Sequence, residues 1–257
     1  MEPYKRAELV EKILSLDKDS ALELAKIIYD KYKADFKNSE YLDEFLEIAN
    51  DYDRFGEYEK ALNIYLKAEK RALILDSKEH LAPIYAGMGI VYNYLKEYDS
   101  SLRSYEKAIN LFKELNNEQE IGILYNNMGF VYKNILKFQE SIRSYINAIE
   151  IFRKIDDKFS MSAAYFNIAD IFKYLKDYET SLKYIEKCID IDIDLKLESL
   201  DDDIDYKNEL LRKLGRAKKE DLKKDKKEEN VFLDDEDDED INKKPEGNRW
   251  NWLWKKK

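Results

Sequence analysis

The chain contains one histidine, His80, and one cysteine, Cys188, residue types that often carry proton transfer or nucleophilic attack. His80 lies at the start of a predicted helix, with no second histidine or cysteine nearby to complete a catalytic pair. Cys188 occupies a position at which equivalent segments of the chain have alanine, which predicts a buried and inert thiol. We therefore expect neither residue to be catalytic.

An alternating acidic run, Asp190, Asp192 and Asp194, is followed by Asp201 and imitates the spacing of a calcium-binding loop. Such a loop needs a glycine for its sharp turn, and Leu195 stands in that place. The seven glycines of the chain also form neither a phosphate-binding loop nor a dinucleotide fingerprint. The sequence therefore predicts no metal, no cofactor and no enzymatic activity.

The composition favours long helices, because 44% of the residues are hydrophobic while glycine and proline number only seven and three. A single cysteine excludes an internal disulfide, and the first residues contain no apolar signal region. No apolar run approaches the roughly 20 residues needed to cross a bilayer, and a net charge of -10 disfavours binding to nucleic acid. We expect a cytoplasmic protein without a membrane span.

A repeat with a period of 40 residues is the strongest feature of the sequence. Its copies read DYDRFGEYEKALNIYLKAE at 51–69, VYNYLKEYDSSLRSYEKAI at 91–109, VYKNILKFQESIRSYINAI at 131–149 and IFKYLKDYETSLKYIEKCI at 171–189. Whole columns are maintained, and one of them reads Phe45, Tyr85, Tyr125 and Tyr165. Because apolar residues in each copy step by three and four, each unit is predicted to be two helices joined by a tight turn.

Small residues recur where the two helices of a unit should meet. Glycine costs about 1 kcal/mol against alanine within a helix, and Gly89 and Gly129 are tolerable if the partner helix approaches closely at Ser101 and Ser141. Pro83 lies in the first helix of its unit and removes an amide donor. We expect that helix either to begin later than its counterparts or to bend there.

These columns resemble the tetratricopeptide repeats. The resemblance rests on the pattern Tyr85, Met88, Gly89, Tyr92, Ser101, Tyr105 and Ala108 and covers residues 38–197. It is most similar to the branch with repeats of about 40 residues, found in kinesin light chains, Pins-type scaffolds and bacterial peptide-sensing regulators. HEAT-type repeats share this length but lack the glycine and alanine columns. The resemblance implies an all-α fold, a right-handed solenoid of stacked antiparallel helix pairs.

The repeat and the composition together predict the domain organisation. A degenerate N-terminal helix pair would precede the repeats, a helix with a thin stripe of Leu200, Ile204, Leu211 and Leu214 would cap them, and a disordered charged tail would follow. The predicted boundaries are 1–37 for the degenerate pair, 38–77, 78–117, 118–157 and 158–197 for the repeats, 198–220 for the cap and 221–257 for the tail.

The concave surface of such a stack is lined by the first helix of each unit and should form a peptide-binding groove. Asparagine offers a donor and an acceptor to the main chain of an extended peptide. The predicted contact residues are Asn50, Arg54, Asn93, Tyr94, Asn126, Asn127, Phe130, Lys133, Asn134, Phe166, Asn167, Lys173 and Tyr174. At the positions of Asn127 and Asn167, the resemblance implies asparagines that hold ligand backbone.

We therefore expect a scaffold or adaptor that binds a peptide segment of a partner protein. Two alternatives stay open, namely a regulatory sensor of a small signal peptide and an accessory subunit of an enzyme complex. The absence of a DNA-binding or catalytic segment in the sequence favours the scaffold over the sensor.

The end of the chain carries all three tryptophans, Trp250, Trp252 and Trp254, followed by Lys255–Lys257. In an extended strand the three rings would lie on one side, and each could gain roughly 1.5–3 kcal/mol on burial. We interpret this segment as a docking motif at the end of the tail, beyond a run of acids at 234–240. Its receiver could be a separate protein, an anionic membrane surface bound only weakly, or the groove of the same chain.

Overall fold

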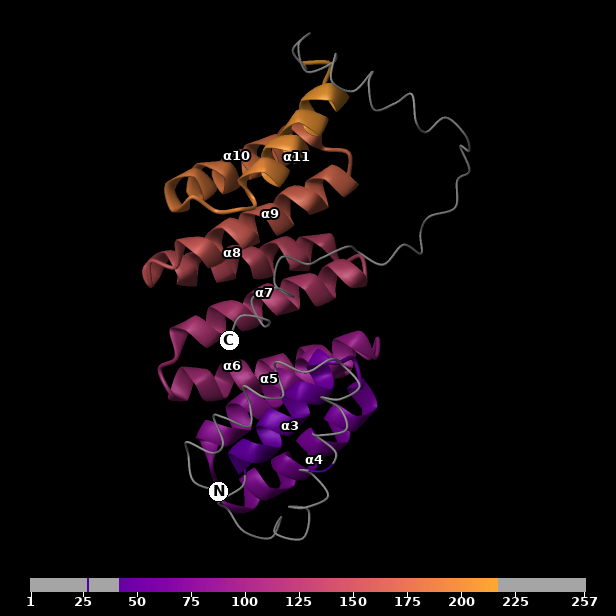
Figure 1. Cartoon of the computed structure of the whole chain (residues 1–257), viewed down its shortest axis with the longest axis vertical. Helices are drawn as coiled ribbons and strands as arrows, with labels where there is room; N and C mark the ends of the chain where they lie inside the picture. The colour runs from indigo at the N-terminus through magenta and orange to yellow at the C-terminus, as the bar shows by residue number, and fades with distance from the viewer. Residues whose placement is uncertain (1–26, 28–41, 217–257) are drawn as a thin grey trace, which may run out of the picture. The chain divides into compact units, whose positions relative to one another are not determined.

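The computed structural model describes residue 27 and residues 42–216 (Figure 1). The predicted N-terminal pair, at 1–37, therefore lies outside the described residues except for Ile27, and the tail with its three tryptophans lies entirely outside them. In the described part the secondary structure consists of nine α-helices and no strands. The helices are α3 (Leu42–Arg54), α4 (Tyr58–Ile74), α5 (Lys78–Tyr94), α6 (Tyr98–Glu114), α7 (Glu118–Asn134), α8 (Phe138–Lys154), α9 (Lys158–Tyr174), α10 (Tyr178–Leu195) and α11 (Leu200–Lys213). The prediction of an all-α fold is confirmed.

Each turn between helices contains one residue with a left-handed backbone, and these residues recur every 20 positions. They are Gly56, with a φ of 77°, and then Asp76, Lys96, Asn116, Leu136, Asp156, Lys176 and Lys196, with φ between 49° and 62°. At Lys96, for example, the amides of Lys96 and Glu97 donate to the carbonyls of Asn93 and Tyr92, which closes the end of α5. The 40-residue period is therefore the sum of two helices of 17 residues and two short turns.

The described residues divide into two compact units, 42–136 and 137–216. In the first unit, α4 packs against α3 and α5, and α6 packs against α5 and α7. The first helices of the repeats, α3, α5 and α7, are also in contact with one another in order. Because the boundary falls between α7 and α8, the two helices of the predicted repeat 118–157 belong to different units.

The close approach predicted at Gly89 is present in the first unit. The hydroxyl of Ser101 donates to the carbonyl oxygen of Gly89 over 2.6 Å, and a Cβ at Gly89 would lie 2.4 Å from Cε1 of Tyr105. Gly87 is equally constrained, because its Cβ would lie 2.4 Å from the ring of Tyr65 on α4. Glycine is thus required where two tyrosine rings pack directly on the backbone of α5.

Pro83 neither delays nor shortens its helix. The helix α5 begins at Lys78, in the same register as α7 and α9, and contains Pro83 within it. Of the two expected alternatives, the later start is therefore wrong, and a bend at Pro83 stays a prediction. Pro83 is the sixth residue of α5, and the helical hydrogen bonds already begin at Leu81 N, which donates to Ser77 O; the proline therefore removes the amide that would have donated to the carbonyl oxygen of Glu79.

The core of the second unit lies between α9 and α10, and side chains of α8 and α11 complete it. Its fully buried side chains include Tyr145, Ile168, Ile171, Ile185 and Leu210. The serine contact of the first unit recurs here, since Ser181 Oγ donates to the carbonyl oxygen of Ala169 over 2.7 Å.

The helix α11 occupies the place of a first helix in the 40-residue register. Leu200, Leu211 and Leu214 of the predicted stripe pack against the core of the second unit, whereas Ile204 is 38% exposed. Leu210, which the stripe did not include, is fully buried. At the positions where earlier first helices carry aromatic, aliphatic or small residues, α11 carries Asp205, Asn208, Glu209 and Arg212.

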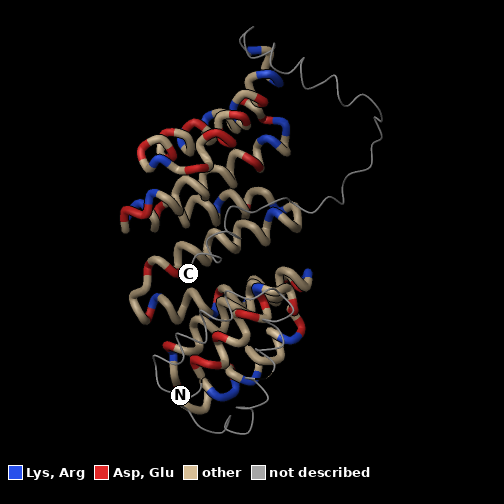
Figure 2. The backbone as a smooth tube through the Cα atoms, viewed as in Figure 1, with Lys and Arg blue, Asp and Glu red and all other residues tan. Residues whose placement is uncertain are grey.

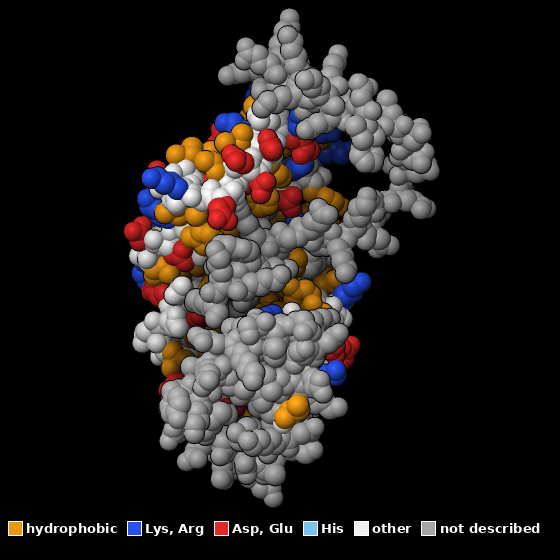
Figure 3. Space-filling model, in the orientation of Figure 1, with side chains coloured by type: hydrophobic (Ala, Val, Ile, Leu, Met, Phe, Trp, Pro, Cys, Tyr) orange, Lys and Arg blue, Asp and Glu red, His pale blue; other side chains and the backbone are white. Residues whose placement is uncertain are grey.

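Acidic residues recur along α10 and α11 (Figure 2). On the visible surface of these helices, hydrophobic side chains are interspersed with charged ones (Figure 3). None of the helices in the described ranges combines the length and the apolar composition that a bilayer crossing requires.

Candidate functional site

The predicted contact residues lie on the first helices of the repeats. We define the first-helix face of the first unit by the predicted residues of α3, α5 and α7 other than the buried Asn126, together with Asp53 of α3; its members are Asn50, Asp53, Arg54, Asn93, Tyr94, Asn127, Phe130, Lys133 and Asn134. The remaining predicted residues, Phe166, Asn167, Lys173 and Tyr174, lie on α9 in the second unit. Because these three helices contact one another in order, the face is continuous within the first unit.

Two amides on this face are joined across neighbouring helices. Asn134 Nδ2 on α7 donates to Asn93 Oδ1 on α5 over 3.1 Å. Asn93 is buried and Asn134 is half-buried. The bond fixes both amide groups in direction, which lowers the entropy that a ligand would lose on bonding to them.

An aromatic pair forms the edge of the same face. The ring of Tyr94, the last residue of α5, stacks on the ring of Tyr58, the first residue of α4, with centroids 4.6 Å apart and planes 5° apart. Tyr94 remains 38% exposed. Burial, the neighbouring Tyr94 and the charge of Asp53 raise the pKa of Tyr58 to about 12, so its hydroxyl stays protonated at neutral pH.

Polar groups of α3 complete the face. The hydroxyl of Tyr65, which is fully buried on α4, donates to Asn50 Oδ1. The guanidinium of Arg54 lies 3.3 Å from Asp51 Oδ1. Burial raises the pKa of Asp51 to about 6, although Arg54 acts in the opposite direction.

The burial and the raised pKa of Asp53 were not predicted from the sequence. Its Oδ1 is buried and has no hydrogen-bond partner among the described residues. Burial raises the pKa of Asp53 to about 7, and the nearby Arg54 lowers it only in part. The Asp53 charge also contributes to the raised pKa values of Tyr58, Tyr65 and Tyr105, so the carboxylate lies within the electrostatic reach of three tyrosines.

The other predicted residues of α7 differ in their accessibility. Asn126 is fully buried, while Asn127, Phe130 and Lys133 are half-buried. A surface ligand could therefore contact Asn127, Phe130 and Lys133 directly, whereas Asn126 could act on a ligand only through its neighbours.

In the second unit, α11 engages two of the four predicted residues. Lys173 forms an ion pair with Glu209 and lies 4.4 Å from the ring centroid of Tyr206. The ring of Phe166 packs on Tyr206 with centroids 5.3 Å apart. Asn167 is buried, whereas Tyr174 is 62% exposed beside Phe138. Within this unit, Tyr174 is thus the predicted residue that is most accessible to a ligand.

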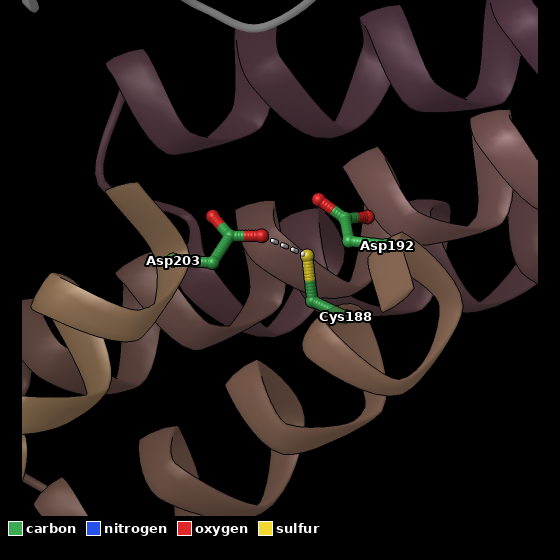
Figure 4. A group of neighbouring side chains, drawn as sticks. All are labelled: Cys188, Asp192 and Asp203. Carbon is green, nitrogen blue, oxygen red and sulfur yellow. Dashed lines mark hydrogen bonds between the residues drawn. The ribbon is translucent and has the colours of Figure 1, made fainter. Parts of the chain in front are cut away.

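A buried polar cluster joins α9, α10 and α11 (Figure 4). Cys188 Sγ donates to Asp203 Oδ2 over 3.0 Å, and Ser199 Oγ donates to Asp192 Oδ2 over 2.7 Å. Ser162 on α9 donates to Asp192 Oδ1 and lies 3.1 Å from Cys188 Sγ. The predicted burial of Cys188 is confirmed, and sequence reasoning missed the two aspartates that surround it.

Thiol and carboxylate groups are metal ligands, and one ligand atom each of Cys188, Asp192 and Asp203 lies within 4.8 Å of the others. The hydrogen bonds described above nevertheless use the thiol proton and both Asp192 oxygens for contacts between helices. We interpret the cluster as a polar joint that holds α11 on α9 and α10. The alternating acidic run does not gather around it, because Asp190 and Asp194 are exposed.

His80 lies in the first turn of α5. Its Nδ1 is 2.6 Å from Ser77 Oγ, and its Nε2 is 3.2 Å from Asp43 Oδ1. Since Asp43 is exposed and belongs to α3, these contacts connect the two first helices at the surface. A hydroxyl, an imidazole and a carboxylate thus lie in series at the start of α5.

Comparisons with known proteins agree with this architecture. A family model of the tetratricopeptide repeat matches residues 120–194, and a second model of this repeat matches residues 82–114. No protein of curated function matches the sequence.

Several solved structures share the fold. BtubC (BKLC) from P. vanneervenii is 18% identical with a TM-score of 0.63, and the match covers 91% of this chain and 99% of that one. A signal transduction ATPase with numerous domains and a tetratricopeptide repeat sensor, from Pyrococcus horikoshii, is 19% identical with a TM-score of 0.66, covering 82% and 32%. The apo form of RapI is 15% identical with a TM-score of 0.64, covering 80% and 57%. The chain thus spans about a third of the second protein and just over half of the third, and these likenesses concern the fold alone.

Proposed function

Because the chain is a tetratricopeptide repeat protein, we propose that it is a non-enzymatic scaffold that binds a peptide segment of a partner protein along its first-helix face. The observation that supports this role is the continuous row of oriented amides and an exposed, stacked tyrosine on α5 and α7. Such groups suit an extended peptide, whose main chain carries unpaired donors and acceptors.

Each asparagine side chain has an oxygen that accepts and two hydrogens that it can donate. The bond between Asn134 and Asn93 uses one hydrogen of Asn134 and the oxygen of Asn93. Asn134 Oδ1 can accept from a peptide amide, and the second hydrogen on Asn134 Nδ2 can donate to a peptide carbonyl. Tyr94 then supplies apolar area for a side chain of the ligand. Asn127, half-buried on α7, is the residue of this unit that the family resemblance assigns to ligand backbone.

The test is a selection of displayed random peptides on the immobilised full-length chain. Selected peptides should bind the wild-type protein and lose most of their affinity for the double variant Tyr94→Ala, Asn134→Ala. The matched control is Asn110→Ala, which removes an exposed amide from the second helix α6. Peptides that bind all three proteins equally, or a selection that yields none, would refute the proposal.

The tail is proposed as a second contact, with Trp250, Trp252 and Trp254 docking either on a partner or on the first-helix face itself. Deletion of residues 221–257 distinguishes these roles. If the tail docks on the chain, the deletion changes amide signals of the repeats and strengthens peptide binding. Unchanged signals would leave the tail as a contact for a partner only.

The sensor remains the alternative. It would use the same face but would transmit a change in the arrangement of the helices when a small peptide binds. Small-angle scattering with and without a selected peptide separates the two, because a scaffold should keep its scattering profile and a sensor should not.

A further inference from the structure

We propose that the first-helix face contains a site for a lysine side chain of the bound peptide, with the Asp53 carboxylate as its anion and the Tyr58–Tyr94 ring pair as its wall. This inference rests on the proposed peptide-binding function and specifies one residue, a lysine, that the bound peptide should contain.

The carboxylate of Asp53 is available for a cation. Its Oδ1 has no hydrogen-bond partner among the described residues, although the atom is buried. The nearest basic side chain in sequence, Arg54, has its guanidinium 3.3 Å from Asp51. A buried acceptor without a partner costs free energy, and the positive charge of an ammonium group beside this half-buried side chain would offset part of that cost.

The surroundings of Asp53 suit an ammonium group. Asn50 lies three residues earlier on the same face of α3, so its amide oxygen can accept a second ammonium proton. The stacked rings of Tyr58 and Tyr94 present π-electrons that attract a cation. The same unit already contains such a contact, since Lys107 Nζ lies 4.6 Å from the ring centroid of Tyr85.

Other cations fit this arrangement less well. A divalent metal ion prefers six or more oxygen ligands, or a set of nitrogen and sulfur ligands, whereas Asp53 provides one carboxylate among phenol groups. Arginine prefers a carboxylate with both oxygens accessible in one plane, and here Oδ1 is buried. The compact ammonium of lysine needs only one accessible approach.

Equivalent positions in the next repeats support a defined register. The position of Asp53 is occupied by Asn93 in the second repeat and by Lys133 in the third. Among these three helices, a carboxylate occupies this position in α3 alone. A bound peptide would therefore place its lysine at the α3 end of the face. The charge sequence along α3, α5 and α7 would fix the direction of the peptide.

Binding of an ammonium group should be linked to pH. The groups that interact electrostatically with the Asp53 carboxyl are Arg54 on α3, Tyr58 and Tyr65 on α4, and Tyr105 on α6. The tyrosines carry no charge at neutral pH, since a phenol has an ordinary pKa of about 10 and burial raises the pKa values of these three further. Since burial raises the pKa of Asp53 to about 7, the ammonium should bind more tightly at pH 8 than at pH 6 and should release a proton near pH 7.

The experiment uses the isotope-labelled full-length chain and two capped amino acids, Nα-acetyl-lysine methylamide and its neutral analogue Nα-acetyl-norleucine methylamide. The lysine probe should move the amide signals of Asp53, Tyr58 and Tyr94 and lower the titration midpoint of the Asp53 carboxyl carbon. The Asp53→Asn variant should weaken binding by about tenfold or more, the contribution of one charge-assisted hydrogen bond. The control Asp99→Asn makes the same change on the exposed start of α6 and should bind as the wild type does.

Equal binding of the norleucine probe, equal binding to Asp53→Asn, or unmoved signals with the lysine probe would each overturn the lysine site. The proposed function fails in a different way. If displayed peptides still require Tyr94 and Asn134 while the lysine probe fails, only the lysine site is refuted. If the lysine probe binds while no displayed peptide does, the peptide-binding function is refuted.

Discussion

Replacing Asp53 by asparagine should make the first unit more stable at neutral pH. Burial raises the pKa of Asp53 from 3.8 to about 7, which means that the folded chain binds this proton more tightly than the unfolded chain. Its contribution to stability is therefore fully present below about pH 4 and is lost as the pH rises to about 7. Asparagine has nearly the same shape and no charge, so it avoids this loss.

The magnitude follows from the size of the pKa shift. A shift from 3.8 to about 7 corresponds to roughly 4 kcal/mol at pH values above 7, and this is an upper limit because the side chain is not fully buried. We expect Asp53→Asn to raise the free energy of unfolding by about 2 to 4 kcal/mol at pH 8 and by clearly less at pH 5. The position of Asp53 in the last turn of α3 adds to the effect, since a helix C-terminus disfavours negative charge.

The assay is urea denaturation at pH 5 and pH 8, together with amide hydrogen exchange that reports on α3 to α6 separately from the second unit. Separate readouts are needed because repeat arrays do not always unfold in one step. Asp99→Asn, a change at an exposed residue of α6, is the control and should leave the free energy of unfolding unaffected at both pH values. A variant that is less stable than the wild type at pH 8, or a gain that is equal at both pH values, would refute the reasoning. A confirmed gain also means that any loss of lysine binding in this variant is not caused by unfolding.

Three further predictions concern the fold. Gly89→Ala should lower the free energy of unfolding by about 1–3 kcal/mol, because its Cβ would overlap a tyrosine ring; an unchanged urea midpoint would contradict that contact. Leu136→Asn should stabilise the protein by about 1 kcal/mol, because Leu136 has a φ of 60° that asparagine adopts at lower cost. The control Leu175→Asn, at a residue with a φ of -73°, should bring no such rise in Tm, and equal effects at both sites would exclude the backbone as the cause. Cys188→Ala should lower the free energy of unfolding by about 1 kcal/mol. Because Cys188 donates to Asp203, Asp203→Ala should lower the free energy of unfolding less in the Cys188→Ala variant than in the wild type. Strictly additive effects in this double-mutant cycle would exclude a direct bond.

The repeat itself could be predicted from the sequence because its packing is the same in each copy. The columns of Tyr105 and Gly89 recur every 40 residues, and a recurrent small residue opposite a recurrent large one has few structural explanations other than close helix contact. The contact of Ser101 with the carbonyl of Gly89 follows this expectation directly. Local periodicity was thus sufficient for the helices and for the pairs that they form.

The departures from the repeat were harder to predict, because each depends on a contact between residues that are distant in sequence. The repeat pattern predicts that Cys188 is buried, but it does not predict the hydrogen bond from Cys188 to Asp203 of α11. Similarly, Lys173 was assigned to a ligand, whereas Glu209 of α11 pairs with it in the structure. The division of the repeat 118–157 between two units also leaves no trace in the columns.

These departures identify which positions carry function. A residue that recurs in every copy is explained by packing, whereas a polar residue buried in one copy alone costs stability and needs another explanation. At Asp192 the explanation lies within the chain, because two serine hydroxyls donate to its carboxylate. At Asp53 no donor among the described residues reaches the buried Oδ1, and the pKa of the group is correspondingly raised to about 7. A cation supplied by a ligand would resolve this imbalance, so the free energy that the unliganded chain loses at Asp53 would be regained on binding.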